Sequence, residues 1–588
     1  MSRSKALITV VGGSLARRRW ENLCAENWQR YGDRHGYDVH CLEDAHDPQD
    51  GRGWRRVGQA LEHPLARGLE RLVFLDATVL IHPEAGDVSA AVPPQMVGAV
   101  DAYAAPSPDR LRAARLRLYR FWEDRGLSFV RRETAEAFYR TQGRTPSFEG
   151  VTQPGVLVLS PARHRDVVLR ACDSSGVEDE DGAALSHDLL SANLVHWLDA
   201  RFNVSWLIQK CEACPFLFSR PHHPRASACA LRALAHSYFL NFANCEQDMP
   251  LAEGWRGVAS AGASPCASAD TPEDSGAAAF ELTTPVALIL YNRAETTREV
   301  FAAIRHARPK RLLLIADGPS PGKPDDEAAC ASARLAAGPV DWPCEVETIY
   351  SETNLGIRQR IDTGLDWVFT RCEEAIILED DCVPDPSFFR YCQELLVRYR
   401  DDPRIMGVGG NSFQYGLGPE DDGYYLSGYA QTWGFATWRR AWRRYDAAMA
   451  RWPELRDLGW LSERFVDRTA TAYWSHVFEE NHRTGDHWDI AWMFSVWVHK
   501  GLFALPRHPL VSNVGLGREA THTRRYEIEF ADLPTGPLRF PLRHPADIVA
   551  DQTADRLTDE LMFGGMLSEV FQRIRRVAGK MRPPTLAS

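Results

Sequence analysis

Three consecutive acids, Glu379, Asp380 and Asp381, are the strongest chemical feature of the 588-residue sequence. They follow directly on the apolar run 375–378, which is typical of a buried strand. Carboxylates gathered at the end of a buried strand repel one another unless a cation or hydrogen-bond donors compensate their charge. A hard divalent ion, Mn²⁺ or Mg²⁺, bound by one or two of them together with substrate phosphates, would do so. Spacing alone also allows a simpler interpretation, a loop of solvated acids.

Other polar residues also follow apolar runs in this part of the chain. Asn292 and Arg293 follow the run 286–291, and Asp317 follows the run 311–316. Ligands of open α/β sheets bind outside the carboxyl ends of the strands, so we expect these side chains at the same edge as the acids. Arg358 begins the helical segment that leads into the acidic strand.

Further downstream, aromatic residues alternate with a single acid. Trp433 opens the segment 433–438 (WGFATW), for which plain core packing is the alternative interpretation. Asp489 lies between Trp488 and Trp492, which could shield it from water and raise its basicity. Its alternative role is to cap the helix expected over 490–500, because Asp is a favoured N-cap residue.

In their order and spacing these segments resemble the GT-A glycosyltransferases, especially bacterial family 2-like enzymes and the N-acetylglucosaminyltransferase I type. The resemblance covers about 286–524, including the segments 354–358 and 386–392 and the loop 512–523. It implies a nucleotide-diphosphate sugar donor, a metal ion on the diphosphate, and Asp489 as the base of an inverting transfer. It also implies donor binding by Asn292, Arg293, Asp317, Arg358, Glu379, Asp380 and Trp433, and metal binding by Asp381 and His522.

The N-terminal half resembles a galactosyl/mannosyltransferase-type module. The resemblance rests on the strand 72–75 with Asp76-Ala77-Thr78 and on the segments 153–160 and 198–203. It departs from that family at two points: Thr78 replaces the usual second Asp, and the segment 238–242 lacks a metal-binding His, although His236 lies close by. Asp76 and Asp188 are the expected substrate-site acids, with a solvated loop acid as the alternative for Asp188.

Two roles therefore stay open for the N-terminal half. It could be an active transferase with weak or no metal dependence, because one carboxylate and one hydroxyl are weaker ligands than two carboxylates. It could instead be a non-catalytic module that binds the acceptor or acts as a scaffold.

Composition predicts the domain organisation. The segment 257–284 is small and polar, and no Lys or Arg lies between Arg256 and Arg293, which is typical of a linker. We expect a GT-A-like domain over 1–247, a linker over 248–284, a second GT-A-like domain over 285–535, and a helical, basic tail over 536–588. The predicted fold class is α/β: two tandem Rossmann-like domains with mostly parallel sheets, joined by a flexible linker.

Charge and cysteine content narrow the function. Lys plus Arg number 68 against 79 for Asp plus Glu, a net charge of −11, which argues against bulk nucleic-acid binding. Thirteen scattered cysteines predict reduced thiols in the cytoplasm, and no signal peptide or membrane span is apparent. The helical stretch expected over 555–580 ends in a basic cluster. It either packs on the C-terminal domain or contacts the inner face of the membrane.

The resulting expectation is a glycosyltransferase that moves a sugar from a nucleotide-diphosphate donor to a hydroxyl of a glycan or lipid-linked acceptor. Two domains suggest a bifunctional role in polysaccharide biosynthesis. A nucleotidyltransferase is an alternative, although a Gly-rich, Arg-containing loop is expected there and the loop 292–295 has no glycine. A non-enzymatic carbohydrate-binding protein is another, but it would not require clustered acids at a strand end.

Overall fold

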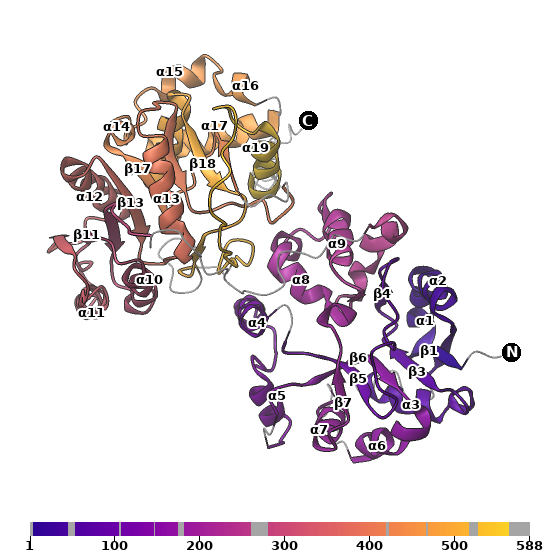
Figure 1. Cartoon of the computed structure of the whole chain (residues 1–588). Helices are drawn as coiled ribbons and strands as arrows, with labels where there is room; N and C mark the ends of the chain where they lie inside the picture. Colours follow the sequence, from indigo (N-terminus) through magenta and orange to yellow (C-terminus); the bar gives the residue numbers. More distant parts are fainter. Residues whose placement is uncertain are drawn as a thin grey trace, which may run out of the picture. The chain divides into compact units, whose positions relative to one another are not determined.

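The computed structural model describes residues 4–44, 53–104, 107–145, 148–174, 182–259, 280–418, 423–465, 468–516 and 527–563. The chain divides into two compact units, Met1–Pro272 (unit 1) and Glu273–Ser588 (unit 2), which are labelled by element in Figure 1. Each unit has its own sheet and its own core.

Unit 1 is built on a six-stranded sheet with the order β2-β1-β3-β6-β5-β7. β1 pairs in parallel with β2 and β3, whereas β6 is antiparallel to both of its neighbours. A three-stranded sheet, β4-β9-β8, lies beyond the end of β3. The strands are β1 Lys5–Val11, β2 Tyr37–Glu43, β3 Arg71–Leu75, β4 Val79–Ile81, β5 Val97–Asp101, β6 Thr152–Leu159, β7 Val195–Trp197, β8 Val204–Ser205 and β9 Phe239–Asn241.

Helices cover both faces of this sheet (Figure 1). The core on one face joins the sheet to α3, α6 and α7, with Val57, Val168 and Leu185 fully or almost fully buried. On the other face Trp28 of α2 is fully buried and donates to Val79 O. The helices are α1 Gly13–Leu23, α2 Ala25–His35, α3 Arg56–Glu62, α4 Pro108–Asp124, α5 Ala135–Thr141, α6 Pro161–Ser174, α7 Ala183–Ser191, α8 Trp206–Ala213 and α9 Ala226–Ala235.

Unit 1 extends past the boundary expected at residue 247. Glu246–Gly257 form a 3-10 helix (η5) whose Asp248 and Met249 are buried. Asp248 Oδ2 accepts from Trp206 Nε1 at 2.8 Å and from Lys210 Nζ at 3.0 Å. The expected start of the linker at 248 was therefore wrong, because these residues bury side chains in unit 1.

Unit 2 is built on an eight-stranded sheet with the order β12-β11-β10-β13-β17-β15-β18-β16. The first four strands are parallel, and β17 joins them antiparallel to β13. The strands are β10 Val286–Leu290, β11 Arg311–Ala316, β12 Glu345–Tyr350, β13 Glu374–Glu379, β15 Ile405–Gly409, β16 Tyr424–Ser427, β17 Phe435–Trp438 and β18 Leu502–Pro506; a separate pair is β14 Cys382–Pro384 with β19 Val511–Asn513.

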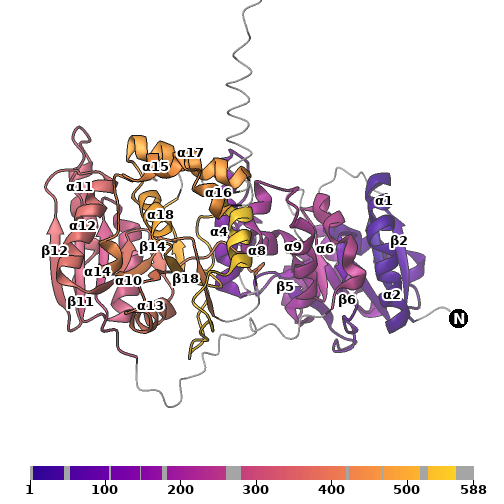
Figure 2. The ribbon, with the colours of Figure 1, turned by 90° about the horizontal axis from the view of Figure 1, so that it is seen from above.

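Two cores flank this sheet. One buries residues of α10 and α13, and the other buries residues of α12, α17 and α18; Figure 2 shows the two groups of helices on opposite faces. The helices are α10 Ala294–Ala307, α11 Asp326–Ala336, α12 Ile357–Arg371, α13 Pro386–Arg398, α14 Arg439–Trp442, α15 Trp452–Asp457, α16 Leu461–Arg464, α17 Arg468–Thr484, α18 Trp488–Val498 and α19 Gln552–Thr558.

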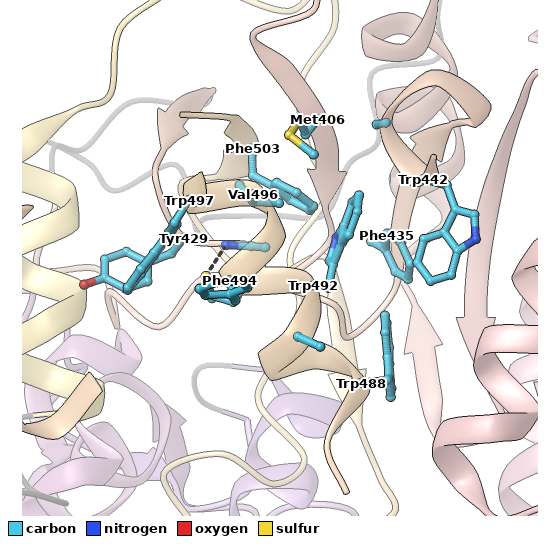
Figure 3. Packing of buried hydrophobic residues seen from close by; sticks show 14 of the residues in the cluster. Met406, Tyr429, Phe435, Trp442, Trp488, Trp492, Phe494, Val496, Trp497 and Phe503 are labelled. Carbon is cyan, nitrogen blue, oxygen red and sulfur yellow. Dashed lines mark hydrogen bonds between the residues drawn. The ribbon is translucent and has the colours of Figure 1, made fainter. Parts of the chain in front are cut away.

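Tryptophans of α18 form the centre of the second core (Figure 3). Trp492 is fully buried and packs on Trp442 with ring centroids 5.4 Å apart. Trp488 packs on Phe435 at 5.8 Å. This packing fixes the helix that carries Asp489 against the start of β17.

The segment after residue 535 is part of unit 2 as far as it is described. Leu538 and Leu542 are buried in the core beside α13, and the Asp555 carboxylate of α19 accepts from Ser427 Oγ at 2.5 Å. The structure therefore agrees with the packing alternative for 555–563, whereas the helical tail expected from 536 begins only at Gln552. The basic end beyond 563 lies outside the described residues. No helix among the described residues is long and apolar enough to span a membrane.

The predicted α/β fold class is confirmed. Each unit opens with a parallel, Rossmann-like half sheet whose strands are joined by helices, and continues into an antiparallel half. Connections between parallel strands need a crossover, and helices on the sheet faces supply it here. This topology places the carboxyl ends of β10, β11 and β13 at one edge of unit 2.

Candidate functional site

The acids at the end of β13 meet an arginine from the neighbouring strand end. β10 pairs in parallel with β13 in the register Ile289↔Glu379, so the residues after Leu290 lie beside those after Glu379. Tyr291 N donates to Asp380 Oδ2 at 3.0 Å. Arg293 bridges two carboxylates, with Nη2 at 2.5 Å from Asp380 Oδ1 and Nη1 at 3.0 Å from Asp381 Oδ2. The predicted site residues Arg293, Glu379, Asp380 and Asp381 therefore lie together.

One guanidinium does not balance three carboxylates. Burial, followed by the charges of Asp381, Asp380 and Asp489, raises the pKa of Glu379 to about 8. Burial raises the pKa of Asp380 to about 6 against the opposing effect of Arg293. Although burial disfavours its charge, Asp380 and Asp381 hold the pKa of Arg293 above its ordinary value. The site thus keeps an excess of negative charge that favours a cation.

The residues around Asp381 fit a hard divalent ion. Carboxylate oxygens are the ligands such ions prefer, and Mg²⁺ is typically held by one or two carboxylates plus substrate phosphates. Gly515 follows β19 and packs so close that an added Cβ would overlap Asp381 Oδ2 and Arg293 Nη1. Among the described residues no group of three His, Cys, Asp or Glu side chains is arranged around one point, so the protein alone does not complete a shell. The predicted ligand His522 lies outside the described residues.

Gly515→Ala is expected to displace the Asp381 carboxylate and the Arg293 guanidinium while leaving the fold intact. The methyl group would overlap both side chains, and the backbone at Gly515 is not in the left-handed region. We expect Mn²⁺-dependent nucleotide binding, measured by calorimetry, to weaken on the order of tenfold or more. Gly536→Ala is the matched control, because its added methyl meets no atom nearer than 3.3 Å. Unchanged nucleotide binding in Gly515→Ala would argue against a substrate site at Asp381.

Glu379 should make the metal-free protein less stable as the pH rises. Its pKa is about 8 in the folded chain and about 4.5 in an unfolded one. Unfolding above pH 4.5 therefore releases a proton, and stability falls until the pH passes about 8. In EDTA, Glu379→Gln should melt several degrees above the wild type at pH 8 and converge with it near pH 4.5. Glu299→Gln, which changes an exposed acid, is the control. If the melting temperature of Glu379→Gln differed from that of the wild type by the same amount at every pH, the raised pKa of Glu379 would be refuted.

Asn292 contacts an acid that the sequence did not single out. Its Nδ2 donates to Asp326 Oδ1 at 2.6 Å, and Asp326 Oδ2 accepts from Ser320 N at 2.6 Å and from the Tyr291 hydroxyl. Burial opposes ionisation of Asp326, but these hydrogen bonds together keep its pKa below the ordinary value. Asp326 therefore holds the loops after β10 and β11 together. Its place in the first turn of α11 was its only sequence signal.

Asp317 and Arg358 have their polar atoms occupied by the chain itself. Asp317 is 4% exposed and accepts from Leu355 N at 2.9 Å and from Gly356 N at 3.1 Å. Arg358 donates to Gly485 O at 2.7 Å and to Ala447 O at 2.9 Å. These contacts favour a structural role for both residues in the free protein. Donor binding by either stays a prediction.

Asp489 and Trp433 lie at the same edge of the sheet as the acids. The charge of Asp489 contributes to the raised pKa of Glu379, so the two carboxylates are within electrostatic reach. β17 runs antiparallel to β13 with Phe435 opposite Ile377, which places the preceding Trp433 near the end of β13. Trp433 is half-buried and packs edge-to-face on Phe413 at 5.4 Å.

The capping alternative for Asp489 was wrong in its simple form. The N-cap residue of α18 is His487, and Asp489 lies in the first turn. An acid there still interacts favourably with the helix dipole, typically by about 0.3–1 kcal/mol. Trp488 and Trp492 are buried in the core as expected, while Asp489 itself is half-buried.

In unit 1, Asp76 and Thr78 form a different arrangement. Asp76 Oδ1 accepts from Thr78 N at 3.0 Å and from Thr78 Oγ1 at 2.7 Å. β4 pairs with β9 in the register Val79↔Asn241, and Asn241 lies within the segment 238–242, where the resemblance led us to look for a histidine. Asn241 Oδ1 is 2.9 Å from Thr78 Oγ1.

A cavity of about 1490 Å³ lies in front of these residues. Asp76, Gly155, Asn203 and His236 line it, whereas Asp188 is not among the described residues of its lining. Asp188 belongs to α7, where it lies 3.5 Å from His187 Nδ1 and is about one-third exposed. The structure thus brings Asp76 and His236 to one cavity but does not bring Asp188 with them.

Comparisons with known proteins found matches among solved structures. The sequence matches no family model and no curated protein. Two similar solved structures are a glycosyltransferase involved in glycosylation of the major capsid of PBCV-1 and the galactosyltransferase LgtC in complex with donor and acceptor sugar analogues. The first is 10% identical, with 42% of this chain and 99% of that chain covered and a TM-score of 0.25. The second is 13% identical, with 43% and 99% covered and a TM-score of 0.24. Likeness at this level says nothing about donor, acceptor or reaction.

Proposed function

We propose that unit 2 is a glycosyltransferase that moves a sugar from a nucleotide-diphosphate donor to a hydroxyl acceptor. The observation that carries this proposal is the joint placement of Arg293, after β10, with Glu379, Asp380 and Asp381 at the end of the neighbouring strand β13. Asp489 lies within electrostatic reach of this group. A site with excess negative charge suits a metal-bridged diphosphate. A separate carboxylate nearby supplies the proton acceptor that a sugar hydroxyl needs.

Residues of unit 2 would each contribute to the transfer step. Asp489 takes the proton of the acceptor hydroxyl as its oxygen bonds to the anomeric carbon and the bond from that carbon to the diphosphate oxygen breaks. Because one base acts on the face opposite the leaving group, the configuration inverts. Arg293 orients Asp380 and Asp381 toward the diphosphate. A divalent ion held by Asp381 would stabilise the charge that develops on the leaving nucleoside diphosphate.

Product analysis on the full chain tests the proposal. A panel of nucleotide sugars, with and without Mn²⁺, should include one that yields free nucleoside diphosphate in proportion to the sugar transferred. Release of pyrophosphate from a sugar phosphate and a nucleoside triphosphate would instead indicate a nucleotidyltransferase. Absence of turnover with every donor, despite glycan binding, would indicate a non-enzymatic carbohydrate-binding protein.

The acceptor and the setting extend this proposal. We propose a glycan or lipid-linked acceptor, as in polysaccharide biosynthesis, and a cytoplasmic enzyme whose basic end after residue 563 contacts the inner face of the membrane. A bifunctional enzyme would require a second set of catalytic carboxylates in unit 1. Thr78 and Asn241 disfavour a metal-dependent one, so we assign the transfer step to unit 2.

A further inference from the structure

The residues at the end of β3 in unit 1 do not fit a divalent ion. Asp76 Oδ1 accepts two hydrogen bonds from Thr78, and the Thr78 hydroxyl also lies 2.9 Å from Asn241 Oδ1. Asn241 Oδ1 accepts in addition from Ala243 N at 2.9 Å, and its Nδ2 donates to Asn203 Oδ1 at 3.0 Å. These neutral groups satisfy one another. Asp76 Oδ2 remains as the one anionic oxygen of the set, too few for a hard cation.

This series of hydrogen bonds ends at Asn203, whose side-chain amide is a buried donor beside the cavity. Asn203 lines the cavity, is 3% exposed, and its Nδ2 has no acceptor within the described part of the chain. A Cβ added to Gly155, also in the lining, would overlap Asn241 Nδ2 and lie 3.1 Å from Asn203 Nδ2. A buried amide without a partner costs about 1–3 kcal/mol, which a ligand oxygen reached after a small shift would recover.

The charges of the cavity balance without a ligand. Five arginines and five carboxylates line it. Arg201 forms a bidentate pair with Asp199, and Arg110 pairs with Glu212 at 3.2 Å. Arg115 is committed to backbone, donating to Arg132 O at 2.7 Å. Three of the five arginines are thus engaged by the chain itself, while the five carboxylates, Asp76 among them, would repel an anionic diphosphate, so an uncharged ligand is favoured.

Aromatic rings form another part of the lining. Tyr119 stacks on Phe129 with centroids 5.1 Å apart and planes 2° apart, and Trp122 lies 5.8 Å from Phe129. Trp122 and Phe129 are half-exposed. Sugar rings present apolar C–H faces to such surfaces and hydroxyls to polar groups such as Asp76. A volume of about 1490 Å³ exceeds the roughly 300–1,000 Å³ of ordinary small-molecule pockets, which suits several rings.

From these observations we infer that unit 1 binds an uncharged oligosaccharide in this cavity without a divalent ion. Asp76 Oδ2 accepts from a sugar hydroxyl, Asn203 Nδ2 donates to a sugar oxygen, and the Tyr119, Trp122 and Phe129 rings contact the sugar faces. The choice of a glycan as ligand rests on the proposed function. The site would hold the acceptor chain on which unit 2 acts.

An oligosaccharide array tests the inference on the full chain. The probes are uncharged and acidic oligosaccharides of two to six rings, read out in EDTA and again in Mn²⁺. We expect binding to uncharged glycans in EDTA, with Kd changed less than about twofold by Mn²⁺. Asp76→Asn, which keeps an acceptor for Thr78 but replaces Oδ2 by a donor, should weaken binding about tenfold or more. Trp122→Ala should do the same.

Matched variants locate the site. Asp166→Asn and Leu127→Ala alter an exposed acid and an exposed apolar residue outside the lining, and should bind as wild type. Failure of every uncharged glycan to bind in EDTA would overturn the inference, as would wild-type binding by both Asp76→Asn and Trp122→Ala. Binding of a nucleotide sugar that needs Mn²⁺ and Asp76 would also overturn it. Because binding is measured without turnover, loss of transfer by unit 2 would not affect the result.

A variant with a second carboxylate beside Asp76 tests independently whether unit 1 binds a divalent ion. In a chain carrying Asp381→Asn, which silences the unit 2 site, Thr78→Asp places a second carboxylate beside Asp76. We expect Mn²⁺ to raise the melting temperature of this variant but not that of the Asp381→Asn parent. An Mn²⁺ response of the parent that is lost on Asp76→Asn would show that unit 1 holds a metal as it stands.

Discussion

Asp381→Ala should abolish sugar transfer and Mn²⁺-dependent nucleotide binding while leaving the protein folded. Asp381 lies after the strand, its side chain is 13% exposed, and its contacts are with Arg293 and with the thiol of its chain neighbour Cys382. Arg293 keeps its shorter contact to Asp380, so the loop after β10 stays in place. Asp381 would bind the ion that stabilises the negative charge of the diphosphate, so its loss should lower the rate of transfer on the order of 10²-fold or more.

The measurement is initial-rate transfer at limiting Mn²⁺, beside calorimetric nucleotide binding and a melting curve. Asp381→Asn is the conservative variant, because it keeps the side-chain volume and removes the charge. Asp401→Asn, an exposed acid after α13, controls for the loss of one negative charge in this acidic unit. Near wild-type turnover of Asp381→Ala at limiting Mn²⁺ would show that the diphosphate binds elsewhere.

The strands that carry the site could be predicted from the sequence because they are short, continuous apolar runs. The run 311–316 has the bounds of β11, and 375–378 lies within β13. Parallel strands buried on both faces give such runs, so their carboxyl ends, and the acids there, could be placed at one edge. Asp489 could be placed from its tryptophans, although the pattern suggested an N-cap position that His487 occupies instead.

Contacts between distant segments could not be predicted in the same way. Arg293 was expected to bind the donor, but its pairing with Asp380 depends on the register of β10 against β13. Asn241 reaches Thr78 across 163 positions of sequence through the pairing of β4 with β9. Asp317 was also expected to bind the donor because it follows a strand, but its carboxylate accepts a hydrogen bond from the backbone of Leu355 instead. Residue type and spacing carry no information on which partner satisfies a polar group.

Asp489→Asn should lower transfer by about 10²–10⁴-fold with little change in melting temperature or donor binding. The side chain lies in the first turn of α18, beside tryptophans that fix the helix in the core, so the variant should fold. Asparagine has nearly the same shape but cannot accept the proton of the acceptor hydroxyl. A role in helix stability alone would cost about 0.3–1 kcal/mol through the helix dipole and would leave the rate of transfer almost unchanged.

The pH profile separates the base from a positioning role. If Asp489 takes the proton, the acidic limb of the kcat/KM profile, which reports the free enzyme's essential base, should disappear in Asp489→Asn. Asp486→Asn, an exposed acid three residues earlier, is the matched control and should keep the wild-type profile. Because Asp489 also raises the pKa of Glu379, the melting temperature of the metal-free variant should depend less on pH than that of the wild type. An Asp489→Asn enzyme with a near-normal rate and an unchanged acidic limb would leave the helix-dipole interaction as the only role of this carboxylate.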